Sequence, residues 1–388
     1  MTTRNLKLFN FIFPLSGAFF FTPILIPFFF ECGLSVGQTF WVESIFSVFV
    51  LIFEIPSGFI SDFFGRKKTL ITAFFCLVIS GIIYGFAKNF GQFVIGEFFW
   101  ALGTSLRSGT DSALIFETLK NHGAQKNFQK VFGHFKFLEI VAIGISAVIG
   151  GFLAKFFGFT ICFFATAVAA FFATILCFFL HEFKIEKSQK IAPHEIFKIS
   201  KKIFHDEKTF RYLIFFIAVA TATATLAFWF EPLLFLRLKI PLQLFGILLL
   251  VSKIICASAA KSTHFFVKFF GEKKFLGANF VILISIFVAI AIFRNYFLIL
   301  ILFGGGAVFN FLLVFIDEKI NKKFVDRNRA TALSVNNFLR GFLRATLTFI
   351  VGTVFDFWNF EIAATFIAGF IAIFGGIFLI KSKYFNFY

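Results

Sequence analysis

Residues 54–68 read EIPSGFISDFFGRKK, and this short polar stretch separates two apolar runs of about twenty residues, at positions 39–60 and 70–87. An apolar run of that length spans about 30 Å of hydrocarbon as an α-helix, because each residue adds about 1.5 Å. Within a bilayer, only a helix satisfies all the backbone hydrogen bonds of a single segment. The stretch therefore predicts two membrane-spanning helices joined by a short charged loop.

The same alternation of apolar runs and charged loops continues along the chain. Hydrophobic residues make up 59% of the 388 and charged residues 15%, against about a quarter charged in soluble domains. Phe supplies 74 residues, which we interpret as interchangeable lipid-facing side chains. We expect an all-α membrane protein with twelve transmembrane helices, at about 8–30, 39–60, 70–87, 91–117, 131–154, 159–180, 210–233, 242–263, 275–293, 297–316, 331–353 and 360–380.

The longest polar interruption, from His181 to Lys208, divides these spans into two sets of six. We therefore expect an N-terminal six-helix half at 1–180, a cytoplasmic linker at 181–209 and a C-terminal six-helix half at 210–388. Within the linker, residues 196–203 have the spacing of a short amphipathic helix on the inner leaflet. A solvated basic linker is an equally good interpretation.

The positions of Lys and Arg predict the orientation. If the N-terminus is cytoplasmic, 26 of the 37 cations fall in cytoplasmic loops and five in external loops. Cytoplasmic loops retain Lys and Arg, so both termini are expected inside, in a multi-pass protein of the cytoplasmic membrane. This distribution explains the net charge of +17 without a nucleic-acid partner. The five expected external cations are Lys88, Lys155, Arg237, Lys239 and Arg294.

Other classes of site find little support in the sequence. The five cysteines are scattered, no HExxH pair of histidines occurs, and no Walker A sequence is present. We therefore expect no metal, no cofactor and no ATP-driven step. The apolar run that follows Arg4 and Lys7 is too long for a signal peptide, so it is expected to be a retained span. The expected partners are a small solute, a coupling proton or other ion, and lipids, with the chain acting as a monomer.

Four segments share a frame of Gly, an ion four residues later and Gly at the seventh step, with the third and fourth copies degraded. The offsets between the two halves are nearly equal, 206 and 201 residues, and the copies fall alternately in expected cytoplasmic and external loops. A three-span unit that recurs in alternating orientation is the inverted repeat of many transporters. The four segments are 58–65, 151–158, 264–271 and 352–359.

In its span pattern and repeats, the chain resembles the major facilitator superfamily. The stretch 58–68 resembles the signature G-x-x-x-D-x-x-G-R-K/R between spans two and three, and SGTDSALIFETL at 108–119 and RATALS at 329–334 are similar to members as well. Two departures weaken the alternative of a drug/proton antiporter. Span four has Glu97-FFW-Ala101 without the usual Arg, and span five has SAVIGG at 146–151 without the usual Pro.

The signature residues have a physical role of their own. Gly58 and Gly65 permit close helix approach and a tight turn, and Arg66 and Lys67 favour anionic headgroups. Asp62 is a carboxylate suited to the positive end of a neighbouring helix, and the resemblance implies that this helix is span eleven. The resemblance therefore implies a conformational gating motif made of Gly58, Asp62, Gly65, Arg66 and Lys67. A plain topological anchor is the alternative.

The resemblance also implies that spans one, four, seven and ten line a central cavity. Each of these spans is interrupted by small or polar residues, among them Thr223 and Asn310, although helix packing alone explains any one of them. Ions inside spans are functional candidates. Arg107 has the spacing to pair with Asp111, as Lys136 has with Glu139, and Glu54 lies at a depth that would let it bridge to Arg107.

Three cations lack an obvious local partner: Lys253, Arg340 and Arg344. We interpret them as a site for the carboxylate or phosphate of a solute, although ion pairs with Glu97 or Glu139 are the rival explanation. The predicted substrate-binding residues are Arg107, Asp111, Thr223, Lys253, Asn310, Arg340 and Arg344.

These features predict a secondary active transporter, or permease, for a small organic solute, with an anionic metabolite as one candidate. Proton coupling would require a buried carboxylate, for which Glu54, Glu97 and Glu139 are the candidates. A drug or metabolite efflux antiporter is the alternative within the superfamily. A receptor on a transporter scaffold and a membrane-embedded enzyme are further alternatives, but the sequence offers neither a large soluble domain nor a catalytic cluster.

Overall fold

A computed structural model describes residues 4–183, 208–323 and 326–382, and within these ranges the chain forms helices and no strands. The chain divides into two compact units, which are considered separately below. Unit 1 comprises Met1–Ser188 and Ile240–Leu250, and unit 2 comprises Gln189–Lys239 and Val251–Tyr388. The predicted linker and its amphipathic helix at 196–203 lie outside the described residues.

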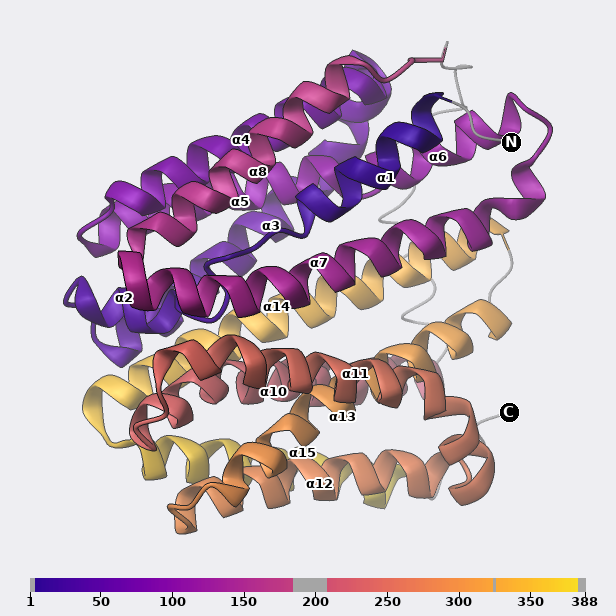
Figure 1. The fold of residues 1–388 in the computed structure, drawn as a ribbon. Coiled ribbons are helices and arrows are strands. Elements are labelled where there is room, and N and C mark those ends of the chain that lie inside the picture. Colours follow the sequence, from indigo (N-terminus) through magenta and orange to yellow (C-terminus); the bar gives the residue numbers. More distant parts are fainter. Residues whose placement is uncertain (1–3, 184–207, 324–325, 383–388) are drawn as a thin grey trace. The chain divides into compact units, whose positions relative to one another are not determined.

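Unit 1 is a bundle of apolar helices. Helix α4 packs against both α5 and α8, while α1 packs against α7 and α8, and Figure 1 shows α4, α5 and α8 lying side by side. The centre is filled by phenylalanines such as Phe9, Phe13 and Phe74, which are at most 1% exposed. The helices are α1 (Arg4–Ser16), α2 (Leu25–Glu31), α3 (Val36–Phe64), α4 (Arg66–Phe86), α5 (Phe90–Arg107), α6 (Thr110–Lys120), a short 3-10 helix (Gln125–Asn127), α7 (Phe128–Phe157) and α8 (Thr160–Phe178).

In unit 2, helix α10 packs against α13 and α14, and α12 packs against α13 and α15. Close packing relies on small residues, since a Cβ placed on Gly305 of α13 would collide with the Cβ of Ala227 on α10. Helix α10 also contains Pro232, which cannot donate a hydrogen bond to the carbonyl of Phe228. The helices are α10 (Lys208–Arg237), α11 (Leu242–Phe270, whose residues 242–250 belong to unit 1), α12 (Glu272–Ile292), α13 (Phe297–Lys323), α14 (Asp326–Phe357) and α15 (Phe360–Ser382).

Ten helices of the described chain are long and apolar enough to cross a membrane, and the all-α membrane fold is confirmed. Two predicted spans are broken instead of continuous. The span expected at 8–30 divides into α1 and α2, and the span expected at 91–117 divides into α5 and α6, where Gly109 has a φ of 79°. The unwound backbone after α1 is satisfied by other helices, because the Phe20 amide donates to Thr166 Oγ1 at 3.1 Å and Ser146 donates to the Gly17 carbonyl at 3.4 Å.

Unit 1 separates the loops that were expected on opposite sides. In unit 1, the Asn5 side chain bonds to both Thr118 and the His181 carbonyl, so three segments expected inside meet at one end. At the other end, the Cys32 thiol donates to the Ala87 carbonyl at 3.6 Å. The alternation of the spans is therefore visible within the unit, while the side that faces the cytoplasm stays a prediction.

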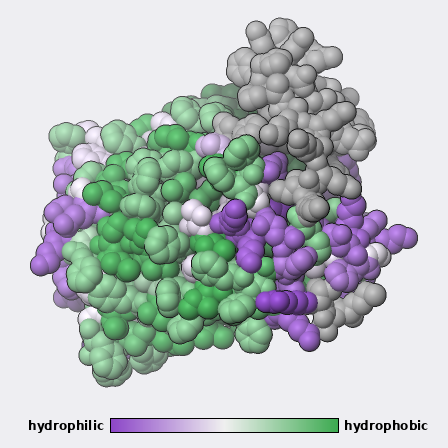
Figure 2. Space-filling view, turned by 90° about the horizontal axis from the view of Figure 1, so that it is seen from above, coloured by the Kyte–Doolittle hydropathy of each residue, from purple (hydrophilic) through white to green (hydrophobic). Residues whose placement is uncertain are grey.

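The outer surface suits a bilayer. Large apolar side chains that are more than half exposed project from α4 and α8, including Phe75, Phe86 and Phe172. Figure 2 shows a face covered mostly by hydrophobic residues, with hydrophilic residues gathered at two opposite sides. In water such a surface would drive aggregation, whereas lipid tails accommodate it.

Candidate functional site

A buried ion cluster in unit 1 joins α5, α6 and α7. The Arg107 guanidinium lies 2.7 Å from Glu139 Oε1 and 3.5 Å from Asp111, and Lys136 donates to Glu139 Oε2 at 2.9 Å. The predicted Arg107–Asp111 and Lys136–Glu139 pairs are thus confirmed. One carboxylate, Glu139, is compensated by two cations, so the cluster is well neutralised in its buried setting.

The break between α5 and α6 orients this cluster. Arg107 is the last residue of α5, at the negative end of that helix dipole, and Asp111 lies in the first turn of α6, at the positive end. The guanidinium also lies 5.4 Å from the ring centre of Phe13 and 5.8 Å from that of Phe74. Both charges are therefore stabilised by the helix ends as well as by each other.

The other two predicted proton carriers differ in burial. Glu54 is exposed on α3, and the predicted bridge from Glu54 to Arg107 is not formed among the described residues, since Arg107 meets Asp111 and Glu139. Glu97 is 5% exposed and accepts a hydrogen bond from the Tyr84 hydroxyl. Of these two acids, only Glu97 has the enclosed setting that a proton carrier in lipid requires.

Unit 2 contains a buried acid, Glu231, that was not among the site residues predicted from the sequence. Glu231 on α10 is 0% exposed; its Oε1 accepts a bond from the Ser252 hydroxyl at 3.0 Å, and its Oε2 is buried without a hydrogen-bond partner. Lys253, on the neighbouring helix α11, is close enough to act electrostatically on Glu231 and lies 4.3 Å from the ring centre of Phe228. The interpretation of Lys253 as lacking a local partner is therefore wrong.

The small and polar residues predicted to line a cavity mostly serve packing within unit 2. Thr223 is fully buried and its hydroxyl donates to the Val219 carbonyl at 3.0 Å, while Asn310 donates to the Gly306 carbonyl at 2.8 Å. A Cβ on Gly306 would come within 2.6 Å of the Cys256 sulfur. These contacts explain the residues as helix-packing features, and a role for Thr223 and Asn310 in solute binding stays a prediction.

Arg340 and Arg344 lie one helical turn apart in the middle of α14 and are half-buried. The Arg340 guanidinium lies 5.7 Å from the ring centre of Phe309 and acts electrostatically on Asp317, both on α13. Arg340 therefore has a local acid, contrary to the expectation from the sequence. Asp317 was missed because it lies on a different helix, about two turns beyond the ring that Arg340 covers.

The gating motif is partly as predicted. Gly65 joins α3 and α4 with a φ of 95°, a conformation that favours glycine. A Cβ on Gly58, by contrast, would meet no atom within 4 Å, so the predicted close helix approach is not seen there. Asp62 is exposed, and its predicted contact with the start of span eleven stays a prediction.

The Arg66 side chain and the Lys67 backbone amide both contact acids of the protein. Arg66 forms a 2.8 Å ion pair with Glu117 at the end of α6, and the Lys67 amide donates to the Glu182 carboxylate at 3.3 Å. Arg66 thus has an acid of the protein as its partner, and its expected contact with anionic headgroups stays a prediction. The motif ties the α3–α4 turn to the ends of α6 and α8.

Residues 8–348 match the sequence profile of the Major Facilitator Superfamily, which covers most of the chain. The chain belongs to the major facilitator superfamily. An uncharacterized transporter of Buchnera aphidicola subsp. Acyrthosiphon pisum (strain APS) is 28% identical over 138 residues, which are 36% of this chain and 32% of that protein. The uncharacterized MFS-type transporter YxaM of Bacillus subtilis (strain 168) is 27% identical over 134 residues, which are 34% of this chain and 32% of that protein. The matched segments thus span about a third of each of these relatives.

Solved structures of the superfamily share the fold over nearly the whole chain. A mutant of the nucleoside transporter NupG has a TM-score of 0.82 at 15% identity, covering 97% of this chain and 98% of that one. The D-xylose-proton symporter has a TM-score of 0.71 at 14% identity, covering 97% and 98%. At such low identity, the likeness establishes the fold, and the chemistry of the site must come from the residues of this chain.

The superfamily fold does not by itself require charged side chains inside the helices. Unit 1 carries the neutralised Arg107–Glu139 cluster, and unit 2 carries Glu231 beside Lys253 and the Arg340–Arg344 pair. Ionisable groups in membrane helices are costly, so they mark the candidate site.

Proposed function

We propose that this superfamily member is a secondary active transporter that moves a small organic anion across the cytoplasmic membrane by alternating access of two six-helix halves. Family membership and the transporter names of its relatives support the transport activity. The observation that carries the anionic solute is the pair Arg340 and Arg344, two guanidinium groups one turn apart in the middle of α14.

Guanidinium groups bind carboxylates and phosphates through two parallel hydrogen bonds, and their planar fork selects those shapes. Asp317 lies within electrostatic reach of Arg340 and so offsets part of its charge in the empty site. A solute carboxylate would compete with Asp317 for Arg340. Because the solute carboxylate replaces Asp317 beside Arg340, the charge of Arg340 is compensated both before and after the solute binds.

The test is uptake of radiolabelled anions into proteoliposomes that hold the purified full chain, with nucleosides and sugars as neutral comparisons. Arg340→Gln should abolish anion uptake, and Arg340→Lys should weaken it about tenfold by losing the bidentate geometry. Asp317→Asn is the matched control and should lower the anion concentration that gives half-maximal uptake, because it removes the competing carboxylate. Retained anion uptake by a well-folded Arg340→Gln variant, or uptake of neutral solutes only, would refute the proposal.

The proposal includes a coupling proton, and the buried acids are not equally suited to carry it. Glu139 is held by two cations and Glu54 is exposed, which leaves Glu97 among the predicted candidates. Glu231 fits better still, because a proton on its unpartnered Oε2 would neutralise a carboxylate that is wholly removed from water. We assign Glu231 as the principal proton carrier of the proposed mechanism and Glu97 as the second candidate.

A further inference from the structure

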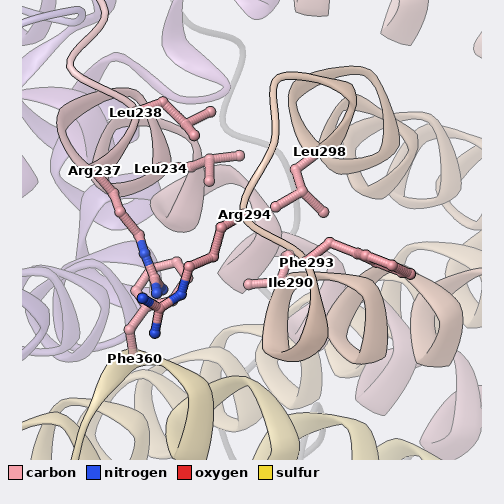
Figure 3. A pocket seen from close by; sticks show the side chains of 8 residues that line it. All are labelled: Leu234, Arg237, Leu238, Ile290, Phe293, Arg294, Leu298 and Phe360. Carbon is pink, nitrogen blue, oxygen red and sulfur yellow. The ribbon is translucent and has the colours of Figure 1, made fainter.

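A cavity of about 220 Å³ opens at one end of unit 2, between the C-terminal end of α10, the α12–α13 turn and the start of α15. Its walls are apolar side chains such as Leu234, Ile290 and Phe293, together with two arginines, Arg237 and Arg294. Figure 3 shows the guanidinium groups of these two arginines lying side by side near Phe360. Two like charges thus converge on one small apolar hollow.

A single carboxylate holds the arginines together. Arg294 donates to Glu361 Oε1 at 2.6 Å, and Arg237 donates to the same oxygen while its guanidinium lies 4.7 Å from the ring centre of Phe360. Each guanidinium has five N–H donors, and in these bonds each gives one Nη to Glu361. Two positive charges therefore face one negative charge, and donors remain for another anion.

The meeting of Arg237 and Arg294 is notable because the sequence places few cations in the expected external loops. Membrane proteins retain few Lys and Arg in external loops, and only five of the 37 cations were expected there. Arg237 and Arg294 are two of those five, and they come from loops 57 residues apart in the chain. Two of the few cations on that side have been brought to the same cavity.

We propose that this cavity binds an anionic group, a carboxylate or a phosphate, that is attached to an apolar body. The guanidinium pair would hold the charged group, as bidentate arginine sites do, and the apolar walls would hold the rest of the ligand. The proposal rests on the proposed function for its placement at the external end, and it adds a second anion site remote from Arg340. The ligand is either a soluble solute arriving from outside or the headgroup of an anionic lipid.

The experiment measures the binding of benzoate and phenyl phosphate, with benzyl alcohol as the neutral probe, to the full chain in detergent. It uses the Arg340→Gln background, so that loss of the central site and loss of the external site are separate results. Benzoate should still bind in that background, and Arg294→Gln should weaken it about tenfold. Lys155→Gln, which removes an expected external cation outside the cavity, is the matched control and should have no effect.

The Glu361→Gln variant distinguishes an anion-binding site from an ion pair that serves only stability. Removal of the competing carboxylate should tighten benzoate binding severalfold if the cavity is an anion site. If the ion pair serves only stability, the variant should have a lower melting temperature and no gain in benzoate binding. Equal affinity for benzoate and benzyl alcohol, or no effect of Arg294→Gln, would overturn the proposal.

The source of the anion is tested in nanodiscs of phosphatidylcholine with and without phosphatidylglycerol. If phosphatidylglycerol competes with benzoate in the Arg340→Gln background, the ligand is a lipid headgroup. If benzoate binds equally in both nanodiscs, the site receives a soluble anion. Both results retain the proposed chemistry, which Arg294→Gln and Glu361→Gln test directly.

Discussion

The two units both bury acids inside membrane helices, but they compensate the charge in different ways. In unit 1, Glu139 lies between Arg107 and Lys136, with a cation at each carboxylate oxygen. In unit 2, Glu231 has a hydroxyl at one oxygen and no hydrogen-bond partner at the other, while Lys253 acts on it electrostatically. The first arrangement is that of a permanent ion pair, and the second leaves room for a proton.

The difference teaches that burial alone does not identify a working carboxylate in a membrane protein. A buried carboxylate whose two oxygens both pair with cations is costly to disturb and contributes to folding. A buried carboxylate with one oxygen lacking a hydrogen-bond partner is sensitive to protonation, because the neutral acid avoids the cost of burying an ion. Substitution of each acid by glutamine tests whether this contrast is real.

The largest expected effect is in unit 1. Glu139→Gln leaves the largely buried Arg107 and the half-exposed Lys136 with one remaining acid, so the free energy of unfolding should fall by about 3 kcal/mol, the lower end of the range for a broken buried ion pair. The measurement is SDS titration of the purified protein in micelles, read by circular dichroism. The double variant Glu139→Gln/Lys136→Gln restores a balanced Arg107–Asp111 pair and should recover most of the loss. Failure of the double variant to recover would show that packing, and not charge, holds this cluster.

The second prediction concerns the same substitution in unit 2. Glu231→Gln keeps an acceptor for Ser252, so stability should change by no more than about 1 kcal/mol if the acid already bears a proton. Transport in proteoliposomes should lose accumulation driven by a pH gradient, while solute counterflow continues. A loss of stability as large as that of Glu139→Gln would instead show that Glu231 is an ionised partner of Lys253.

The third prediction compares the ends of the two units that are expected to face outward. In sealed, right-side-out cells, a membrane-impermeant maleimide should label native Cys32 and an introduced Asn359→Cys, but not Ser188→Cys in the expected cytoplasmic linker. Burial, and then the negative charge of Glu31, raise the pKa of the Cys32 thiol. Less thiolate is therefore present at neutral pH, and labelling of Cys32 should speed up between about pH 7 and 9 more than labelling at position 359. Labelling of Ser188→Cys would reverse the predicted orientation.

The smallest effect is expected at a turn of unit 2. Lys239, after the end of α10, has a φ of 54°, which costs an L-residue about 1 kcal/mol. Lys239→Gly should raise the melting temperature by a few degrees at most, because glycine adopts this conformation without strain. Lys239→Ala is the control and should give no gain. Equal melting temperatures for the glycine and alanine variants would show that the strain is negligible.

Much of the fold was predictable because a bilayer imposes a simple rule on length and polarity. The apolar runs located the spans, and residues 54–68 indicated the superfamily. The breaks after Ser16 and after Arg107 were not predicted, since an interrupted span still looks continuous when hydropathy is averaged. Gly17 and Gly109, at these two breaks, were the available signals.

The site was less predictable, because partners on different helices cannot be read from spacing. Arg107 with Asp111 and Lys136 with Glu139 follow helical spacing and were found. Glu231 with Ser252 and Arg340 with Asp317 lie on separate helices and were missed. An acid followed directly by proline within a span, as in Glu231-Pro232, was the one local sign that α10 carries something unusual.

That proline has a mechanical consequence. Pro232 cannot donate a backbone hydrogen bond to the Phe228 carbonyl, so α10 is least stiff in the turn 228–232, which contains Glu231. The segment 232–237 that follows this turn ends in Arg237, which Glu361 holds at the start of α15. We therefore expect this segment to tilt about the turn at Glu231, because its other end is held by the ion pair. A change in the protonation of Glu231 and a change in anion occupancy beside Arg237 would therefore act on the same six residues, 232–237, from opposite ends.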